Sequence, residues 1–190
     1  MPGNRTIGRR GADGAARPAE PQGLGMTCEI PGRCVHAELA TSAIDVAARL
    51  EELRLSAPDH GAVVSFQGTV RSLTKQGEPL EQLVLDHHPR MTLVSLQRIA
   101  EAGLRRFEVS AVSVVHRCGA MTPGEVIVLV GVASDHRREA FLAADYLMDR
   151  LKTEAVFWKR ELGPFGERWI EPTERDTMDR ERWNEEDAGN

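Results

Sequence analysis

The sequence predicts an α+β fold, with mixed or antiparallel sheets and helices packed against them. Stretches rich in β-branched residues, such as 61–71 and 125–133, predict strands. Apolar residues at helical spacing predict helices over 91–107 and from His136 onward. Short turns with glycine and proline join neighbouring strands, so hairpins are expected instead of the strand–helix alternation of a doubly wound sheet.

The N-terminal half is expected to begin with a strand at 28–37 and a helix at 42–55. Thr41 or Ser42 would cap this helix, because a side-chain oxygen there accepts from a free backbone N–H. The strand at 61–71 is expected to form a hairpin with a second strand at 80–87, ahead of the helix at 91–107.

The C-terminal half is expected to hold two neighbouring strands, at 109–116 and 125–133, which lead into the helix at His136. Ser134 or Asp135 would cap that helix. A turn at 163–166 precedes a short strand at 168–171.

One folded domain is expected over 28–172, between two tails. Residues 1–27 contain many glycines, prolines and arginines but few large apolar side chains, which predicts a disordered N-terminal tail. Met26 is an alternative start. The strongly charged residues 173–190 are expected to form a peripheral C-terminal tail.

The composition favours a soluble cytoplasmic protein with a small anionic ligand. The chain has 190 residues and a formal net charge of −5, which argues against general nucleic-acid binding. No apolar run approaches the ~20 residues that span a membrane. The three cysteines, an odd number at low density, are not typical of a small domain held together by disulfides. The spacings of histidine and cysteine match no familiar zinc pattern, so no metal is expected.

Five cationic residues form a candidate anion site: Arg71, His136, Arg137, Lys152 and Lys159. The start of a helix would add free N–H groups to the charges of His136 and Arg137, a good setting for phosphate. Exposed first-turn residues would look the same, and Arg71 could simply be solvated where its strand ends.

The two lysines are the candidates for chemistry. If the helix continued, Lys152 and Lys159 would lie about 20° apart around its axis and could share a pocket. A lysine partly removed from water has a lowered pKa and can act as acid, base or nucleophile. Both could instead cap the helix C-terminus. Trp158 and Trp169 are expected in the core by default.

Five blocks of sequence carry a resemblance to one family. In order they are 61–71 (GAVVSFQGTVR), 85–91 (LDHHPRM), 115–119 (VHRCG), 130–137 (VGVASDHR) and 148–161 (MDRLKTEAVFWKRE). On these blocks the chain resembles the large, catalytic subunit of molybdopterin synthase over about residues 28–172.

The resemblance implies an α/β-hammerhead-like fold and a sulfurtransferase of molybdenum-cofactor biosynthesis. The substrate would be cyclic pyranopterin monophosphate, which receives two sulfur atoms to form the molybdopterin dithiolene. Sulfur would come from the C-terminal Gly-Gly thiocarboxylate of a small ubiquitin-like carrier, bound to a homodimer in a heterotetramer. No cofactor or metal is implied. The resemblance gives catalytic roles to Lys152 and Lys159 and substrate-binding roles to Arg71, His136, Arg137, Arg160, Glu161, Thr69 and Val70.

Three positions depart from the family pattern: Asp135 adds a carboxylate, Thr69 often corresponds to a lysine or another polar residue, and Val156 often corresponds to a proline. A second hypothesis is a non-catalytic scaffold protein that still binds the sulfur carrier. A third, a phosphate-ester hydrolase, lacks a recognisable nucleophile or paired carboxylates for a metal.

Overall fold

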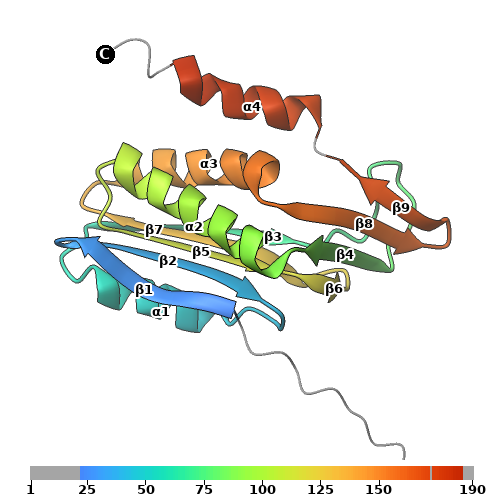
Figure 1. The fold of residues 1–190 in the computed structure, drawn as a ribbon, viewed down its shortest axis with the longest axis horizontal. Coiled ribbons are helices and arrows are strands. Elements are labelled where there is room, and N and C mark those ends of the chain that lie inside the picture. Colours follow the sequence, from blue (N-terminus) through green and yellow to red (C-terminus); the bar gives the residue numbers. More distant parts are fainter. Residues whose placement is uncertain (1–21, 172, 186–190) are drawn as a thin grey trace, which may run out of the picture.

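The computed structural model describes residues 22–171 and 173–185, which form two β-sheets and four helices (Figure 1). The larger sheet runs in the order β1-β2-β5-β7-β3. Its strands are β1 (Gln22–Ile30), β2 (Arg33–Ala40), β5 (Ala111–Arg117), β7 (Val126–Ser134) and β3 (Ala62–Thr69). Only β2 and β5 pair in parallel, so the expected α+β class with a mixed sheet is confirmed.

The smaller sheet is antiparallel and runs in the order β6-β4-β8-β9. Its strands are β6 (Gly119–Met121), β4 (Gln82–His87), β8 (Phe157–Gly163) and β9 (Gly166–Ile170). Buried side chains from β4, β6 and the end of β3 give it a small core of its own, made by Val70, Leu80, Leu83, Leu85 and Met121.

Helices cover both faces of the larger sheet. The helix α1 (Val46–Ser56) lies on one face, and α2 (Pro89–Arg106) and α3 (Arg137–Glu154) lie side by side on the other (Figure 1). Alternate residues of β5 divide between them: Val112 and Val114 pack in the core beneath α2 and α3, whereas Val115 packs on the α1 side. None of the helices in the described part of the chain is long and apolar enough to cross a membrane.

The expected hairpin between 61–71 and 80–87 is wrong. The first of these strands, β3, is an edge strand of the larger sheet and pairs with β7, whereas β4 belongs to the smaller sheet. The intervening segment crosses between the sheets and closes only an isolated bridge from Leu73 to Pro79. A loop of this length can bring β4 to either sheet at similar entropic cost, so sequence order alone does not select the partner.

The N-terminal region differs from the expected single strand. The structure places a hairpin here, with β1 and β2 joined through Gly32, whose φ of 74° is a conformation that favours glycine. Residues 22–27, expected in the disordered tail, belong to β1, and residues 1–21 lie outside the described residues.

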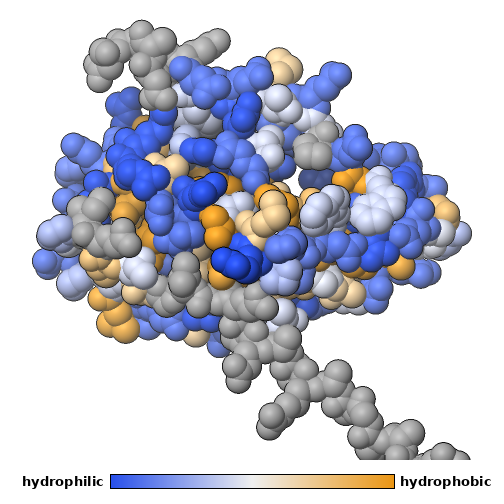
Figure 2. All heavy atoms as spheres, in the orientation of Figure 1, coloured by the Kyte–Doolittle hydropathy of each residue, from blue (hydrophilic) through white to orange (hydrophobic). Residues whose placement is uncertain are grey.

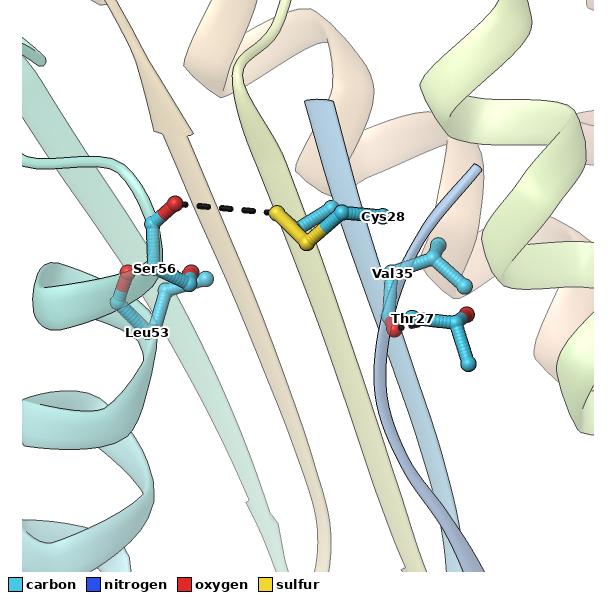
Figure 3. The surroundings of a disulfide bond; sticks show 6 residues. Thr27, Cys28, Val35, Leu53 and Ser56 are labelled. Carbon is cyan, nitrogen blue, oxygen red and sulfur yellow. Dashed lines mark hydrogen bonds between the residues drawn. A yellow bond between two sulfur atoms is a disulfide. The ribbon is translucent and has the colours of Figure 1, made fainter. Parts of the chain in front are cut away.

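A disulfide closes this hairpin, contrary to the expected absence of disulfides. Cys28 and Cys34 lie on adjacent strands with their Cα atoms 4.1 Å apart (Figure 3). The Sγ atom of Cys34 also lies 3.7 Å from the carbonyl oxygen of Ser56, at the end of α1. Cys118 is a free, buried thiol. Pairing was missed because the hairpin that brings the two cysteines together was read as one strand.

The C-terminal residues up to residue 185 do not form the expected peripheral tail. They form α4 (Glu174–Glu185), which packs on α3. Trp183 is buried, its ring meets Tyr146 edge to face, and its Nε1 donates to Oδ2 of Asp149 at 2.9 Å. The high charge concealed a helix that one aromatic side chain, Trp183, anchors to the rest of the fold. Residues 186–190 lie outside the described residues.

Two helix starts also differ from expectation. Asp45, not Thr41 or Ser42, caps α1, since its Oδ1 accepts from the backbone N–H of Ala48 at 3.0 Å. His136 occupies the cap position of α3 but makes no side-chain cap hydrogen bond, while Ser134 accepts from the His136 N–H at 3.3 Å.

Candidate active site

The strand β8 presents alternate residues to opposite sides, and this alternation decides which of them enter the candidate site. Lys159 and Glu161 pair with Leu85 and Leu83 of β4, whose side chains fill the small core. Lys159 is therefore partly buried and Glu161 is 8% exposed. The buried Oε2 of Glu161 has no hydrogen-bond partner among the described residues.

Four charges of described residues act on Lys159, and Lys152 forms an ion pair with one of them, Asp176. These residues are here called the lysine cluster: Arg71, Lys75, Lys152, Lys159, Glu161 and Asp176. Burial lowers the pKa of Lys159 below its ordinary value, and the charges of Lys75 and Arg71 lower it further. Glu161 acts in the opposite direction. The result is a lysine that gives up its proton more readily than one in water.

Arg71 reaches the lysine cluster from the exit of β3. The preceding Val70 is buried in the small core, and its backbone pairs with Glu125 and Gly124 at 2.9 Å each. Thr69 and Arg71, on either side of it, are exposed. Val70 therefore anchors the strand end, and the charge of Arg71 acts on Lys159 from there.

Lys152 lies in the last turn of α3, and its side chain is 50% exposed. Its Nζ lies 3.3 Å from Oδ1 of Asp176, which also acts electrostatically on Lys159. The helix ends at Glu154, so the two lysines do not share a continued helix face as supposed. The chain turns after α3 and returns as β8, and Asp176 of α4 links the two lysines, since it pairs with Lys152 and its charge acts on Lys159.

His136 and Arg137 do not join the lysine cluster within one chain. Both are exposed at the start of α3, and Arg137 precedes Lys152 by fifteen residues. At 1.5 Å per residue the two ends are about 22 Å apart along the helix axis. A single copy of the chain therefore separates the two halves of the expected anion site.

Arg160 also lies outside the lysine cluster, on the opposite side of β8. Its guanidinium contacts Asp86 at 2.6 Å and Glu167 at 2.8 Å and stacks over Trp169 at 5.2 Å. Trp158 is 51% exposed and Trp169 is 59% exposed, so their expected place in the core is wrong. Both belong to the outward face of the smaller sheet, where no second layer covers them in the described structure.

His116 is a residue beside the site that the sequence considered only as a metal ligand. Its ring stacks on Phe157 with centroids 4.3 Å apart, two residues before Lys159. Nδ1 lies 2.9 Å from the carbonyl oxygen of Arg117, so Nδ1 carries the proton and Nε2 keeps its lone pair. Burial, aided by the charge of Lys159, lowers the pKa of His116 to about 4. The imidazole is neutral at pH 7.

No group of three or more histidine, cysteine, aspartate or glutamate side chains gathers around a potential metal position within residues 22–171 and 173–185. The chemical groups present around Lys159 are amines, a guanidinium and carboxylates. Such a set binds anions and transfers protons.

Comparison with family models matches residues 39–154 to the family described as MoaE protein. The chain belongs to this family. Among curated relatives, it is 48% identical over 126 residues to the molybdopterin synthase catalytic subunit of Caulobacter vibrioides, covering 66% of this chain and 82% of the relative. The resemblance carried by the five sequence blocks is therefore confirmed.

Solved structures of the same family share the fold. The MoaE protein from Burkholderia ambifaria aligns with a TM-score of 0.65 and 39% identity, over 76% of this chain and 94% of that one. A complex of subunits 1 and 2 of molybdopterin-converting factor from Helicobacter pylori aligns with a TM-score of 0.57 over 72% and 90% of the chains, and at 19% identity this likeness concerns the fold alone.

Proposed function

We propose that this chain is the catalytic subunit of a molybdopterin synthase, a cytoplasmic sulfurtransferase. It would move sulfur from the thiocarboxylate of a small carrier subunit to cyclic pyranopterin monophosphate. The observation that carries the proposal is the ion pair of Lys152 with Asp176, whose charge, like that of Arg71, also acts on the partly buried Lys159. The names of the curated relatives support it.

The lysine cluster suits the two demands of this reaction. Opening the cyclic phosphate develops negative charge on oxygen, which Arg71 and Lys152 are placed to stabilise. When the thiocarboxylate sulfur bonds to a carbon of the substrate, and water later hydrolyses the acyl–sulfur bond to release the carrier's C-terminal carboxylate, protons must be moved. Lys159, with its lowered pKa, can accept and return a proton near neutral pH more readily than an ordinary lysine.

His136 and Arg137 lie far from the lysine cluster of their own chain, so a site that uses all of these residues needs a second copy of the chain. We infer that a homodimer within the heterotetramer brings these residues from one copy to the lysine cluster of the other. The edge strand β3 offers a contact surface, since Val63 is 37% exposed and Phe66 is 42% exposed. Arg71, at the exit of this strand, would lie close to such a contact.

The deciding experiment combines purified chain, thiocarboxylated carrier and cyclic pyranopterin monophosphate, and detects the dithiolene product. Lys152→Ala and Lys159→Ala are each expected to reduce turnover by more than 100-fold, because a preorganised charged group in an active site contributes about 10²–10³ in rate. Arg54→Ala, an exposed residue of α1, is the control. Carrier binding without product from the wild-type chain would favour the scaffold hypothesis.

Mixed dimers test the contribution of the second copy. A Lys152→Ala chain and an Arg137→Ala chain are each expected to be inactive alone. Their mixture regains activity if each site uses Lys152 of one copy and Arg137 of the other, because some dimers then contain one complete site. No recovery on mixing, with dimers formed, would contradict the shared site.

A further inference from the structure

Lys159 is partly buried, which is unusual for a charged side chain on a surface of this kind. On the molecular face that Figure 2 shows, hydrophilic residues predominate and apolar residues form only patches among them. Burial is also the largest cause of the lowered pKa of Lys159. The proton transfer proposed for this lysine therefore depends on the side chains that keep water away from it.

Phe157 lies on the same side of β8 as Lys159. Successive side chains of a strand point to opposite faces, so residues 157 and 159 share a face and are about 7 Å apart along the strand. Phe157 packs against the core beneath α2 and α3 and also against the small core of the smaller sheet. It therefore bridges the two cores next to Lys159.

His116, at the end of β5, covers this phenylalanine from the larger sheet. The two rings are stacked, with an angle of 28° between their planes and 4.3 Å between their centroids. Nδ1 of the imidazole donates to the carbonyl oxygen of Arg117 at 2.9 Å, and this bond fixes the orientation of the ring. The stack is therefore held from both sides, by the carbonyl of β5 and by the packing of Phe157.

The surroundings of the stack contain few charges besides Lys159 itself. On the neighbouring strands His116 pairs with Leu39 and Val128, both apolar, and Phe157 pairs with His87. Burial, and to a smaller extent the charge of Lys159, lowers the pKa of His116 to about 4. The imidazole is thus neutral at pH 7, so it contributes cover and no charge to the lysine cluster.

We propose that His116 is a positioning residue for Lys159, because its ring, stacked on Phe157, keeps water away from the lysine and holds the start of β8. The inference rests on the proposed function, from which it takes the role of Lys159 in proton transfer. His116 acts through Phe157 and not on the substrate. A phenyl ring at position 116 would serve the same purpose, whereas a methyl group would leave a space that water can enter beside the amine.

Substitutions on both sides of the stack test this role. His116→Ala and Phe157→Leu each remove the stack, whereas His116→Phe keeps it. Trp158→Leu is the matched control, since Trp158 is the next residue of β8 and is exposed on the opposite face. Competitive labelling of lysines with acetic anhydride over a range of pH, read by mass spectrometry, gives the pKa of Lys159 in the free chain.

Loss of the stack should raise the pKa of Lys159 by about one pH unit, because part of the burial that lowers it is lost. His116→Phe and Trp158→Leu should give the labelling curve of the wild type. At a pH below the pKa, an increase of one unit reduces the unprotonated fraction of a lysine about tenfold. The kcat/KM for dithiolene formation should fall by about this factor in His116→Ala and Phe157→Leu, and its rising limb should move to higher pH.

An unchanged Lys159 labelling curve in His116→Ala and Phe157→Leu, with circular dichroism like that of the wild type, would overturn the proposal. A shift in His116→Phe as large as that in His116→Ala would overturn it as well, because the imidazole and not the stack would then be required. Labelling needs neither carrier nor substrate. Failure of the proposed function therefore gives a different result, in which the wild-type chain forms no product although its Lys159 still responds to loss of the stack.

Discussion

The ammonium group of Lys152 lies 3.3 Å from Oδ1 of Asp176, while Oδ2 of the same carboxylate accepts from the N–H and hydroxyl of Thr173 at 2.9 and 2.6 Å. Thr173 and Asp176 thus form a capping box that starts α4, and this box holds the counter-ion of the proposed catalytic lysine. Although burial opposes it, hydrogen bonds from Thr173 and Lys152 lower the pKa of Asp176. The carboxylate is therefore ionised at neutral pH.

Removing this counter-ion should strengthen binding of the anionic substrate. Asp176→Asn keeps an oxygen for the Thr173 cap but no longer neutralises Lys152, so the KM for cyclic pyranopterin monophosphate should fall. A half-exposed ion pair contributes about 0.2–1 kcal/mol, which corresponds to at most about fivefold in KM. Steady-state kinetics at low salt measure the effect, with Asp179→Asn in the same helix as control. An increase in KM would mean that Asp176 positions Lys152 for the substrate.

Substitution of two residues whose charges act on Lys159 should shift the pH dependence of kcat/KM in opposite directions. If Lys159 acts as a base, kcat/KM rises with pH through its pKa. Lys75→Gln removes a cation that lowers this pKa, so the rising limb should move to higher pH. Glu161→Gln removes a carboxylate that raises it, so the limb should move to lower pH. Identical limbs in both variants and the wild type would exclude Lys159 as the titrating base.

Long periodic patterns allowed the sequence to predict much of the fold. The helix expected at 91–107 is Pro89–Arg106, and the strand expected at 125–133 is Val126–Ser134. Strand pairing could not be predicted in the same way, because the apolar pattern of a strand reports its own burial and not the identity of its neighbour. For this reason β3 and β4 were paired with each other although they belong to different sheets.

The residues of the candidate site could likewise be predicted only in part from the sequence. The sequence grouped Arg71 with Lys159, and in the structure the charge of Arg71 acts on Lys159. It also grouped Arg160 with Lys159, although alternation along a strand sends consecutive side chains to opposite faces. The sequence analysis did not single out Asp176, because it lies in a strongly charged stretch. The signal that could have found it is the Thr-x-x-Asp spacing of a capping box. The separation of His136 from Lys152 follows from helix length once the helix is known to reach Glu154.

The partly buried imidazole of His116 should make stability fall as the pH falls. Its pKa is about 4 in the folded chain and ~6.5 when unfolded, so the unfolded state binds the proton first. The contribution of the neutral ring is complete above pH ~6.5 and is lost as pH falls towards 4. Between pH 7 and 5 the loss amounts to about 2 kcal/mol in the free energy of unfolding.

His116→Phe isolates this effect, because a phenyl ring keeps the stack on Phe157 but takes up no proton. Urea denaturation at pH 7, 6 and 5 should show a pH dependence about 2 kcal/mol smaller than that of wild type. His36, whose pKa burial also lowers, accounts for part of the remaining slope. A variant with the wild-type slope would show that His116 is not the buried group that titrates.

The disulfide of the β1–β2 hairpin gives the most direct check on the part of the fold that the sequence misread. Under denaturing conditions without reductant, alkylation should modify only Cys118, and mass spectrometry should find three modified cysteines after reduction. Closing a loop with six residues of sequence separation stabilises by about 2 kcal/mol in the chain-entropy model, so dithiothreitol should lower the free energy of unfolding by that amount. The Cys28→Ser variant should show no such response to dithiothreitol. Three alkylated cysteines without reductant would mean that β1 is not covalently tied to β2, and the hairpin would then depend on its backbone pairing alone.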